Sequence, residues 1–245
     1  MTEPVSVLRH HDREVLVHAT AARLVTRLVD LQRDGGVATL ALTGGTVANE
    51  IYAAVAGSPA AGAVDWARVE LWWGDERFVP AGSEDRNDRQ AREALLDRVP
   101  LNPERVHPMP ASDGPTADLD AAAADYARQL RESPAQRFDI VLLGVGPDGH
   151  VASLFPGFPQ LEVENTITVA VRDSPKPPPE RISLTFPALE RADEVWFLVA
   201  GTEKADAVRR ALAPGTDPHD TPAARPRGAS RTLWLLDEAA AAALA

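Results

Sequence analysis

Short apolar runs alternate with amphipathic stretches along most of the chain. Between residues 14 and 31 the apolar positions recur at helical spacing, and the pattern stops at Gly35-Gly36, which predicts an amphipathic helix. Further helices are predicted at residues 46–56, 87–99, 116–131 and 204–212. Buried strands are predicted at residues 37–42, 69–73, 138–143, 166–171, 195–200 and 232–236.

The alternation of strands and helices predicts an α/β fold with a mostly parallel sheet and helices on both of its faces. Two segments, 174–180 and 214–228, are rich in proline and polar residues and are interpreted as irregular surface loops. Because the composition does not change beyond either segment, residues 1–245 are predicted to form a single domain. The alanine-rich tail at 239–245 is predicted to end a short surface helix.

Composition and charge narrow the class of protein. The formal net charge of −11 argues against nucleic acid or an anionic membrane as the main partner. The chain has no cysteine, which removes disulfides and thiolate catalysis. The sequence shows neither a signal-peptide pattern nor an apolar run of membrane-spanning length. We therefore expect a cytoplasmic protein, monomeric or weakly homo-oligomeric.

The most informative stretch is the loop at residues 144–157, which follows the predicted strand at 138–143. Loops beyond the carboxyl ends of parallel strands are where open α/β proteins bind their ligands. This loop combines flexible glycines with Asp148 and His150, which stand two residues apart. A carboxylate and an imidazole so placed are predicted to form an acid–base unit.

The glycines of this loop also allow a second interpretation. Gly144, Gly146 and Gly149 match the G-x-G-x-x-G spacing of a dinucleotide-binding turn. Against it, Pro147 removes a backbone N–H group, and Asp148 would bring a negative charge towards a pyrophosphate. A stretch broken by proline follows where that motif needs a helix. A catalytic loop is therefore favoured over a dinucleotide site and over a merely structural glycine loop.

The turn Thr43-Gly44-Gly45-Thr46 joins the first predicted strand to a helix. Backbone N–H groups, two hydroxyls and a helix N-terminus together suit the binding of a phosphate. The alternative is a tight turn in which Thr46 caps the helix. The turn lacks the lysine of a P-loop, which argues against a nucleotide triphosphate.

Charged residues follow two further strands. Asp75, Glu76 and Arg77 come directly after the strand at 69–73, and three such charges are not expected in the core. They are interpreted as site residues, the alternative being a solvated loop with an internal ion pair. Lys204 begins a helix, where its charge opposes the helix dipole, a placement that a bound anion would explain. Taken alone, the residue is still better interpreted as an ordinary surface lysine.

Two cations, Lys176 and Arg181, flank the proline-rich segment 174–180. A rigid loop that carries them is suited to closing over an anionic ligand. The alternative is that both are ordinary basic surface residues.

Five of these motifs occur in the order and spacing of one known family. They are Leu42-Thr-Gly-Gly-Thr46, Trp73-Gly-Asp-Glu-Arg-Phe-Val79, residues 144–157, Arg181-Ile-Ser-Leu-Thr185 and Gly201 with Lys204. Over nearly its whole length the chain resembles the 6-phosphogluconolactonase family. The resemblance implies a Rossmann-like three-layer fold of the glucosamine-6-phosphate deaminase type. It also implies metal-independent hydrolysis of 6-phospho-D-glucono-1,5-lactone to 6-phospho-D-gluconate in the oxidative pentose phosphate pathway.

The resemblance also implies roles for individual residues. His150 acts as the general base that activates water, because its ordinary pKa lies near physiological pH. Either Asp148 or Asp75 orients the imidazole or the water, and the sequence leaves both open. Arg77 stabilises the oxyanion that develops on C1. The substrate phosphate is expected to contact Thr43, Gly44, Gly45, Thr46, Arg181 and Lys204.

The chain departs from the family patterns in a few positions. Thr43 replaces the more frequent serine of the phosphate turn, and Val47-Ala48 stand where Thr-Pro is often found. Phe155 stands where the related deaminases have the glutamate used for sugar-ring opening, and Arg77 stands where they have an aromatic residue. A lactonase is therefore favoured over a sugar-phosphate isomerase or deaminase. A non-catalytic sugar-phosphate-binding regulator is the third hypothesis, although it would not need His150.

Metal ligands are few in these motifs, and we predict that no metal or other cofactor is needed. His150 is the only one of the six histidines in a candidate motif, whereas catalytic zinc usually takes three protein ligands. Asp75, Glu76 and Asp148 would suit Mg²⁺, but a phosphorylated lactone that faces arginine and lysine side chains has less use for it.

Overall fold

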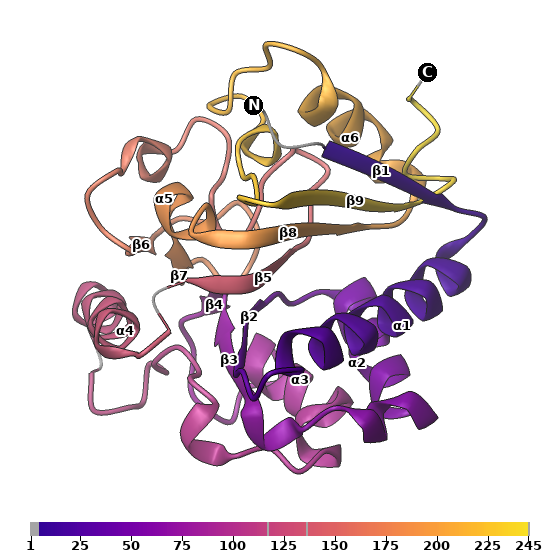
Figure 1. The fold of residues 1–245 in the computed structure, drawn as a ribbon. Coiled ribbons are helices and arrows are strands. Elements are labelled where there is room, and N and C mark those ends of the chain that lie inside the picture. The colour runs from indigo at the N-terminus through magenta and orange to yellow at the C-terminus, as the bar shows by residue number, and fades with distance from the viewer. Residues whose placement is uncertain (1–4, 117, 136, 245) are drawn as a thin grey trace.

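The computed structural model of the protein describes residues 5–116, 118–135 and 137–244. Its centre is a six-stranded sheet in which every neighbouring pair is parallel, in the order β1-β9-β8-β5-β2-β3 (Figure 1). The strands of this sheet are β1 (Val5–His10), β2 (Ala38–Leu42), β3 (Val69–Trp73), β5 (Phe138–Leu143), β8 (Ala192–Val199) and β9 (Arg231–Asp237). The parallel α/β fold predicted from the sequence is confirmed.

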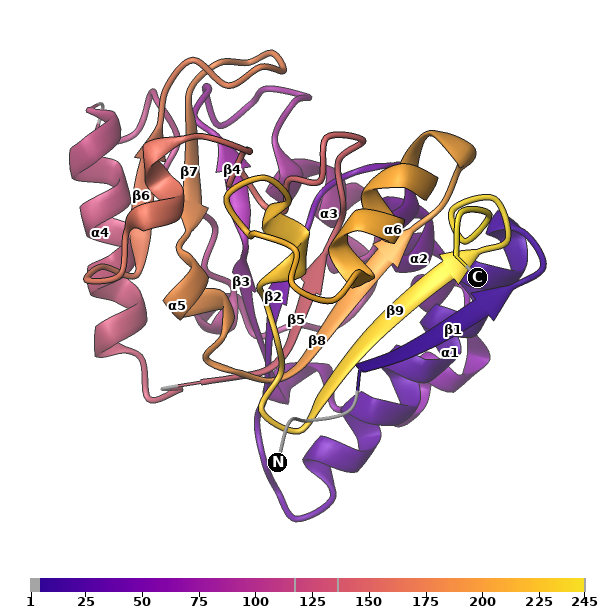
Figure 2. The same cartoon turned by 90° about the horizontal axis from the view of Figure 1, so that it is seen from above.

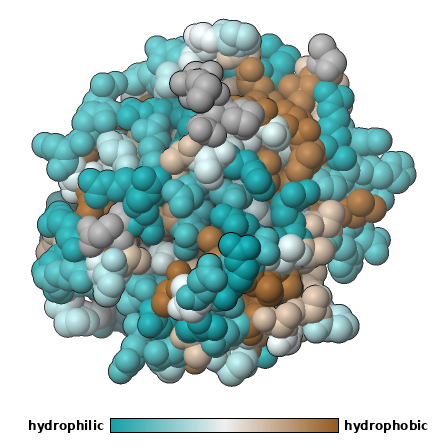
Figure 3. All heavy atoms as spheres, viewed as in Figure 1, coloured by the Kyte–Doolittle hydropathy of each residue, from teal (hydrophilic) through white to brown (hydrophobic). Residues whose placement is uncertain are grey.

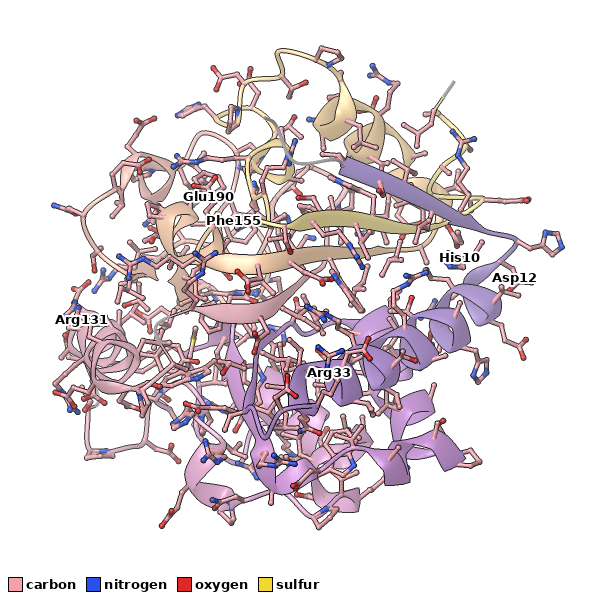
Figure 4. The ribbon with its side chains drawn as sticks, viewed as in Figure 1. His10, Asp12, Arg33, Arg131, Phe155 and Glu190 are labelled. Carbon is pink, nitrogen blue, oxygen red and sulfur yellow. The ribbon has the colours of Figure 1, made fainter. Side chains whose placement is uncertain are left out.

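Helices cover both faces of this sheet, which explains why inner strands such as β2 and β5 are mostly apolar. Figures 1 and 2 show α1 and α2 on one face and α6 on the other. The helices are α1 (Arg13–Gln32), α2 (Thr46–Ala56), α3 (Asn87–Ala94), α4 (Leu119–Glu132), α5 (Phe186–Leu189) and α6 (Ala205–Leu212). Helix α1 begins where Asp12 accepts a hydrogen bond from the Val15 N–H at 2.8 Å, just after the end of β1 at His10 (Figure 4).

A second, smaller sheet was not predicted. Its three antiparallel strands have the order β4-β7-β6 and lie beside the main sheet, with α4 packed against them (Figure 2). The strands are β4 (Asp75–Arg77), β6 (Thr168–Val171) and β7 (Arg181–Leu184). Gly74 alone separates β3 from β4, so the chain passes directly from one sheet to the other.

The expectation that the charges after β3 stay out of the core is wrong. The side chains of Asp75 and Glu76 are buried, with 6% and 1% exposed. Each has polar partners inside the fold, and paired burial of this kind removes most of the cost of taking a charge out of water.

Several predicted boundaries differ from the structure. The helix predicted at 87–99 ends at Ala94 and gives way to a 3₁₀ turn, and the one predicted at 116–131 begins at Leu119. Lys204 closes a short 3₁₀ turn, and α6 starts one residue later. Ala117 and Ala245, which belong to predicted helices, lie outside the described residues.

The alanine-rich tail is not a helix end: residues 239–243 form turns, in which Ala240 and Ala241 are buried. The segment 214–228, interpreted as irregular surface, has a buried centre at Thr221, Pro222 and Ala223. Both segments therefore pack on the fold more closely than their composition indicates.

Most of the surface in Figure 3 is hydrophilic, and hydrophobic atoms gather mainly where Figure 1 places β1 and the C-terminal segment. Val5 and Val7 of β1 are 40% and 36% exposed, in keeping with the position of β1 at the edge of the sheet. Among the described residues no helix combines the length and apolar character needed to span a membrane.

Candidate active site

Two adjoining cavities lie beyond the carboxyl ends of β2, β5 and β8. Their volumes are about 260 and 300 Å³, and both are lined by the phosphate turn, by Gly144 and by Lys204. The carboxyl ends of neighbouring parallel strands meet at one edge of the sheet, which explains why loops far apart in sequence converge here. Among the predicted site residues, the first cavity is lined by Thr43, Gly44, Gly45, Asp75, Arg77, His150, Arg181 and Lys204, and the second adds Thr46.

His150 and Asp148 form a close pair on the loop after β5. The His150 Nδ1 atom lies 2.5 Å from Asp148 Oδ1, and the ring packs on Phe155, with the two ring centroids 4.6 Å apart. Gly146 leaves the space for this pair, because a Cβ atom there would lie 2.0 Å from His150 Nδ1. With Nδ1 engaged by a carboxylate, Nε2 is the ring nitrogen available to a substrate or to water.

The pairing also changes the titration of Asp148. Burial alone would raise the pKa of this carboxyl, but the hydrogen bond from His150 and its charge outweigh burial and lower the pKa to about 2. The carboxylate thus stays ionised throughout the range in which histidine titrates, and it holds the imidazole in one orientation.

This lowered pKa predicts a pH-dependent contribution to stability. The Asp148 carboxylate should stabilise the folded protein above its ordinary pKa of 3.8 and lose that effect as the pH falls towards 2. The free energy of unfolding of the wild type should therefore exceed that of Asp148→Asn above about pH 4, and the difference should shrink between pH 4 and 2. Urea unfolding of both proteins from pH 2 to 6 measures this, and a difference that is constant over that range would contradict the assignment.

The segment 214–228 and helix α6 form hydrogen bonds to the loop that carries Asp148 and His150. The Ala223 N–H donates to Gly149 O at 2.9 Å, and Arg210 of α6 bonds both Thr221 Oγ1, at 2.7 Å, and Asp148 O, at 3.3 Å. Gly149 adopts φ +95°, and a Cβ atom there would come within 2.8 Å of Thr221. No helix follows the glycines, since residues 144–158 form turns and a single bridge, which argues against the dinucleotide interpretation.

Asp75 lies in the same cavity but does not contact the imidazole in this structure. Its Oδ2 atom accepts a hydrogen bond from the buried Ser153 hydroxyl at 2.6 Å. Ser153 in turn donates its N–H to Ser183 Oγ of β7, at 3.2 Å. Of the two carboxylates that the sequence analysis left open, Asp148 therefore lies against His150, and Asp75 is bonded to Ser153.

Arg77 reaches the cavity from the end of β4, and its guanidinium donates through Nη1 to Asn87 Oδ1. Asn87, the first residue of α3, also lines the cavity and was missed by the sequence analysis. A buried polar residue at a helix start, ten positions after a charged motif, gives no signal that distinguishes it from a helix cap.

The Glu76 side chain contacts the start of α3 and does not line either cavity. Its carboxylate accepts from the N–H groups of Arg77, Asn87 and Asp88 at 2.8, 2.7 and 2.9 Å, and Arg86 Nη2 lies 3.7 Å away. Burial raises the pKa of Glu76, whereas Arg86 and the N–H donors favour its carboxylate form. Glu76 therefore orders the loop and helix next to the cavity, and it is not a lining residue of either cavity.

The phosphate turn presents the open N-terminus of α2 to the cavities. The cap residue is Gly45, at φ +100°, and it makes no side-chain capping bond. The alternative that Thr46 caps this helix is therefore wrong. Since the first N–H groups of a helix have no intrahelical partner, an 11-residue helix that opens on a cavity is suited to an anion.

Positive charge is concentrated at this site in an otherwise acidic protein. Among the residues that the structure describes, four cations and one carboxylate, that of Asp75, line the cavity of about 260 Å³. The cations are Arg77, Lys176, Arg181 and Lys204. Burial and the nearby charge of Lys176 lower the pKa of Lys204. A bound anion would offset this repulsion between the two positive charges.

Arg181 also shapes the proline-rich loop. Its Nε atom donates to Pro178 O at 3.1 Å, and Nη2 donates to the carbonyls of Lys176 and Pro177 at 3.0 and 3.2 Å. Segment 174–180 is thus held over the cavity by a side chain of β7, and this brings Lys176 and Pro177 to its lining.

The fold and the cavities define a parallel α/β protein with a cationic cavity, suited to an anionic small molecule, beside a histidine–carboxylate pair. Comparisons with known proteins agree with this class. The family described as glucosamine-6-phosphate isomerases/6-phosphogluconolactonase matches residues 11–234. The chain belongs to this family.

Among its relatives, the 6-phosphogluconolactonase of Streptomyces coelicolor is 52% identical over 252 residues, which cover 100% of this chain and 96% of that protein. The 6-phosphogluconolactonase of Mycobacterium tuberculosis is 48% identical, with 95% of this chain and 96% of that protein covered. The crystal structure of 6-phosphogluconolactonase from Thermotoga maritima superposes with a TM-score of 0.81 at 27% identity, covering 96% of this chain and 100% of that one.

Proposed function

We propose that this protein hydrolyses 6-phosphogluconolactone to 6-phosphogluconate in the pentose phosphate pathway, with His150 as the general base. The observation that carries the proposal is the His150–Asp148 pair at 2.5 Å, beside a cavity lined by four cations and the open end of α2. The 52% identity to a 6-phosphogluconolactonase over the full chain supports the choice of substrate.

The orientation of the imidazole supports His150 as the general base. Asp148 accepts the Nδ1 proton, so the lone pair of Nε2 takes a proton from water while the water oxygen bonds to C1 of the lactone. Proton transfer of this kind contributes roughly 10²- to 10⁴-fold in rate. The Asp148 carboxylate stabilises the imidazolium that forms. The same interaction with His150 is what lowers the pKa of Asp148.

Attack of water turns the carbonyl oxygen on C1 into an oxyanion, which Arg77 stabilises with its permanent positive charge. The intermediate then collapses: the bond between C1 and the ring oxygen breaks, and His150 returns its proton to that oxygen as a hydroxyl. The product is the open-chain acid, which ionises at neutral pH. Asp75, which lines the same cavity and accepts a hydrogen bond from Ser153, orients the attacking water in this scheme.

The phosphate is held at a distance from the reacting carbon. The N–H groups at the start of α2, the hydroxyls of Thr43 and Thr46, and the cations Lys204 and Arg181 form its binding site. Because the phosphate does not react, these contacts supply binding and orientation, and the catalytic groups supply the chemistry.

The direct test is an assay of the purified protein with freshly prepared 6-phosphogluconolactone, coupled to 6-phosphogluconate dehydrogenase and read as NADPH formation. Turnover above the spontaneous rate is expected. Ammonia release from glucosamine 6-phosphate would instead support a deaminase. Binding of 6-phosphogluconate without turnover of the lactone would support the regulatory hypothesis.

Metal independence is a separate prediction. Among the described residues no three histidine or acidic side chains gather closely enough to hold a metal ion, and Asp148 and Asp75 are engaged by His150 and Ser153. Dialysis against EDTA is expected to leave kcat and KM of the lactonase reaction unchanged. A loss of activity that one divalent ion restores would contradict the mechanism.

A further inference from the structure

Asn87 occupies the point at which α3, β4 and the phosphate turn meet. Its side chain is buried, with 2% exposed, and still lines the cavity. The Nδ2 group donates to Asp75 O at 2.8 Å, and Oδ1 accepts from the Arg77 guanidinium. The Asn87 amide therefore bonds both the backbone of β4, at Asp75, and the guanidinium of Arg77.

The same amide is packed against the phosphate turn. A Cβ atom on Gly44 would lie 1.8 Å from Asn87 Oδ1, so the absence of a side chain at Gly44 is what allows the contact. The Arg77 guanidinium is thus fixed relative to the turn that holds the phosphate. Without this contact a long arginine side chain has several rotamers of similar energy, and the guanidinium would sample them.

The position of Asn87 is also fixed through its backbone. Its backbone N–H donates to the buried Glu76 carboxylate at 2.7 Å, and the next N–H, of Asp88, donates to the same carboxylate at 2.9 Å. Arg86, with 2% of its side chain exposed, adds a bond from Nη2 to Met109 O at 2.7 Å. The start of α3 is therefore rigidly attached to β4, the strand that carries Arg77.

We infer that Asn87 is a positioning residue for lactone hydrolysis, which holds the Arg77 guanidinium at a set place between the phosphate turn and the reacting carbonyl. The inference rests on the role proposed for Arg77. It accounts for a buried amide in a cavity of charged groups: an acceptor of neutral charge orients the guanidinium and leaves its positive charge available to the oxyanion. Asn87 does not itself touch the reacting atoms.

The test is a double-mutant cycle of Asn87→Ser and Arg77→Ala on the full chain. Serine keeps a small polar side chain at the first position of α3, and this side chain is too short to reach Arg77. We expect Asn87→Ser to lower kcat about 10- to 100-fold with KM within about threefold of wild type, since small misplacements of a catalytic group have effects of this size. In the Arg77→Ala background the same change should lower kcat less than about threefold.

Asn87→Asp provides a second, independent measurement. Aspartate keeps the size of the side chain and the oxygen that accepts from Arg77, and it is also favoured in the first turn of a helix. It loses the N–H donor to Asp75 O, however, and places a negative charge beside Arg77. Its kcat is therefore expected to lie between those of the wild type and of Asn87→Ser. The matched control is Asn49→Ala, which removes an amide that joins α2 to Gln90 of α3 at 3.0 Å outside the cavity, and which should leave kcat and KM unchanged.

Three results would overturn the inference: an Asn87→Ser variant with more than half of the wild-type kcat while Arg77→Ala is impaired, an equal effect of Asn87→Ser in both backgrounds, or an Asn87→Asp variant with a lower kcat than Asn87→Ser. Each leaves the proposed function standing. If Arg77→Ala itself keeps the wild-type kcat, the role of Arg77 fails, and the inference fails with it. A wild type without turnover of the lactone contradicts the proposed function instead.

Discussion

Replacing His150 with alanine is expected to lower kcat for 6-phosphogluconolactone by roughly 10²- to 10⁴-fold. The ring lies beside the cavity with Nδ1 on Asp148 and its face on Phe155, so the variant loses the base and keeps the surrounding loop. Binding of 6-phosphogluconate should persist, because the phosphate turn, Lys204 and Arg181 are untouched. Steady-state kinetics and calorimetric titration with the product measure the two effects separately.

The matched control for this experiment is His11→Ala. His11 is exposed and pairs with Glu238 at 3.6 Å, far in sequence from every motif of the site. It should keep the wild-type kcat and melting temperature. A His150→Ala protein that is folded and retains more than about a tenth of the wild-type kcat at neutral pH would show that another group is the base.

Removing the amine of Lys204 should act on binding and not on the chemical step. Lys204→Ala is expected to raise KM roughly 10- to 100-fold with a small change in kcat, because a charge-assisted contact to a group that does not react is worth about 1.5–3 kcal/mol. Lys204 is half-buried between the two cavities and close to Lys176, so water replaces its charge poorly. Kinetics over a wide range of lactone concentration resolve the two constants.

Gluconolactone without the phosphate supplies the internal comparison. It should be a poor substrate for the wild type, and Lys204→Ala should change its kcat/KM by less than about threefold. Arg33→Ala is the charge-matched control, since Arg33 is exposed at the far end of α1 (Figure 4) and lines neither cavity. Equal use of both lactones by the wild type would remove the basis for a phosphate site.

The central strands and the candidate site could be predicted for the same physical reason. Strands such as β2 and β5, covered by helices on both faces, are mostly apolar, and the loops at their carboxyl ends necessarily converge. This convergence brings the phosphate turn and His150 together. Strand β1 escaped prediction because it lies at the sheet edge, where Val5 and Val7 are exposed and the pattern resembles a surface segment.

The remaining differences arise from contacts between distant segments. Glu76 is buried because N–H groups of α3, eleven and twelve residues away, satisfy its carboxylate, and no local pattern records this. Thr221 is buried because Gly149 and Arg210 lie against it. Proline and polar residues therefore indicated the irregular backbone of 214–228 correctly, but not the buried position of its centre.

The place of β9 in the main sheet has a consequence for how the protein forms during synthesis. Strand β9 lies between β1 and β8, so the first strand of the described chain finds its neighbour only among residues 231–237. The segment that contacts the loop after β5, residues 214–228, also leaves the ribosome after that loop. Until residues 214–237 have been synthesised, a nascent chain carries β1 without its parallel neighbour and the His150 loop without its contacts to residues 221–223.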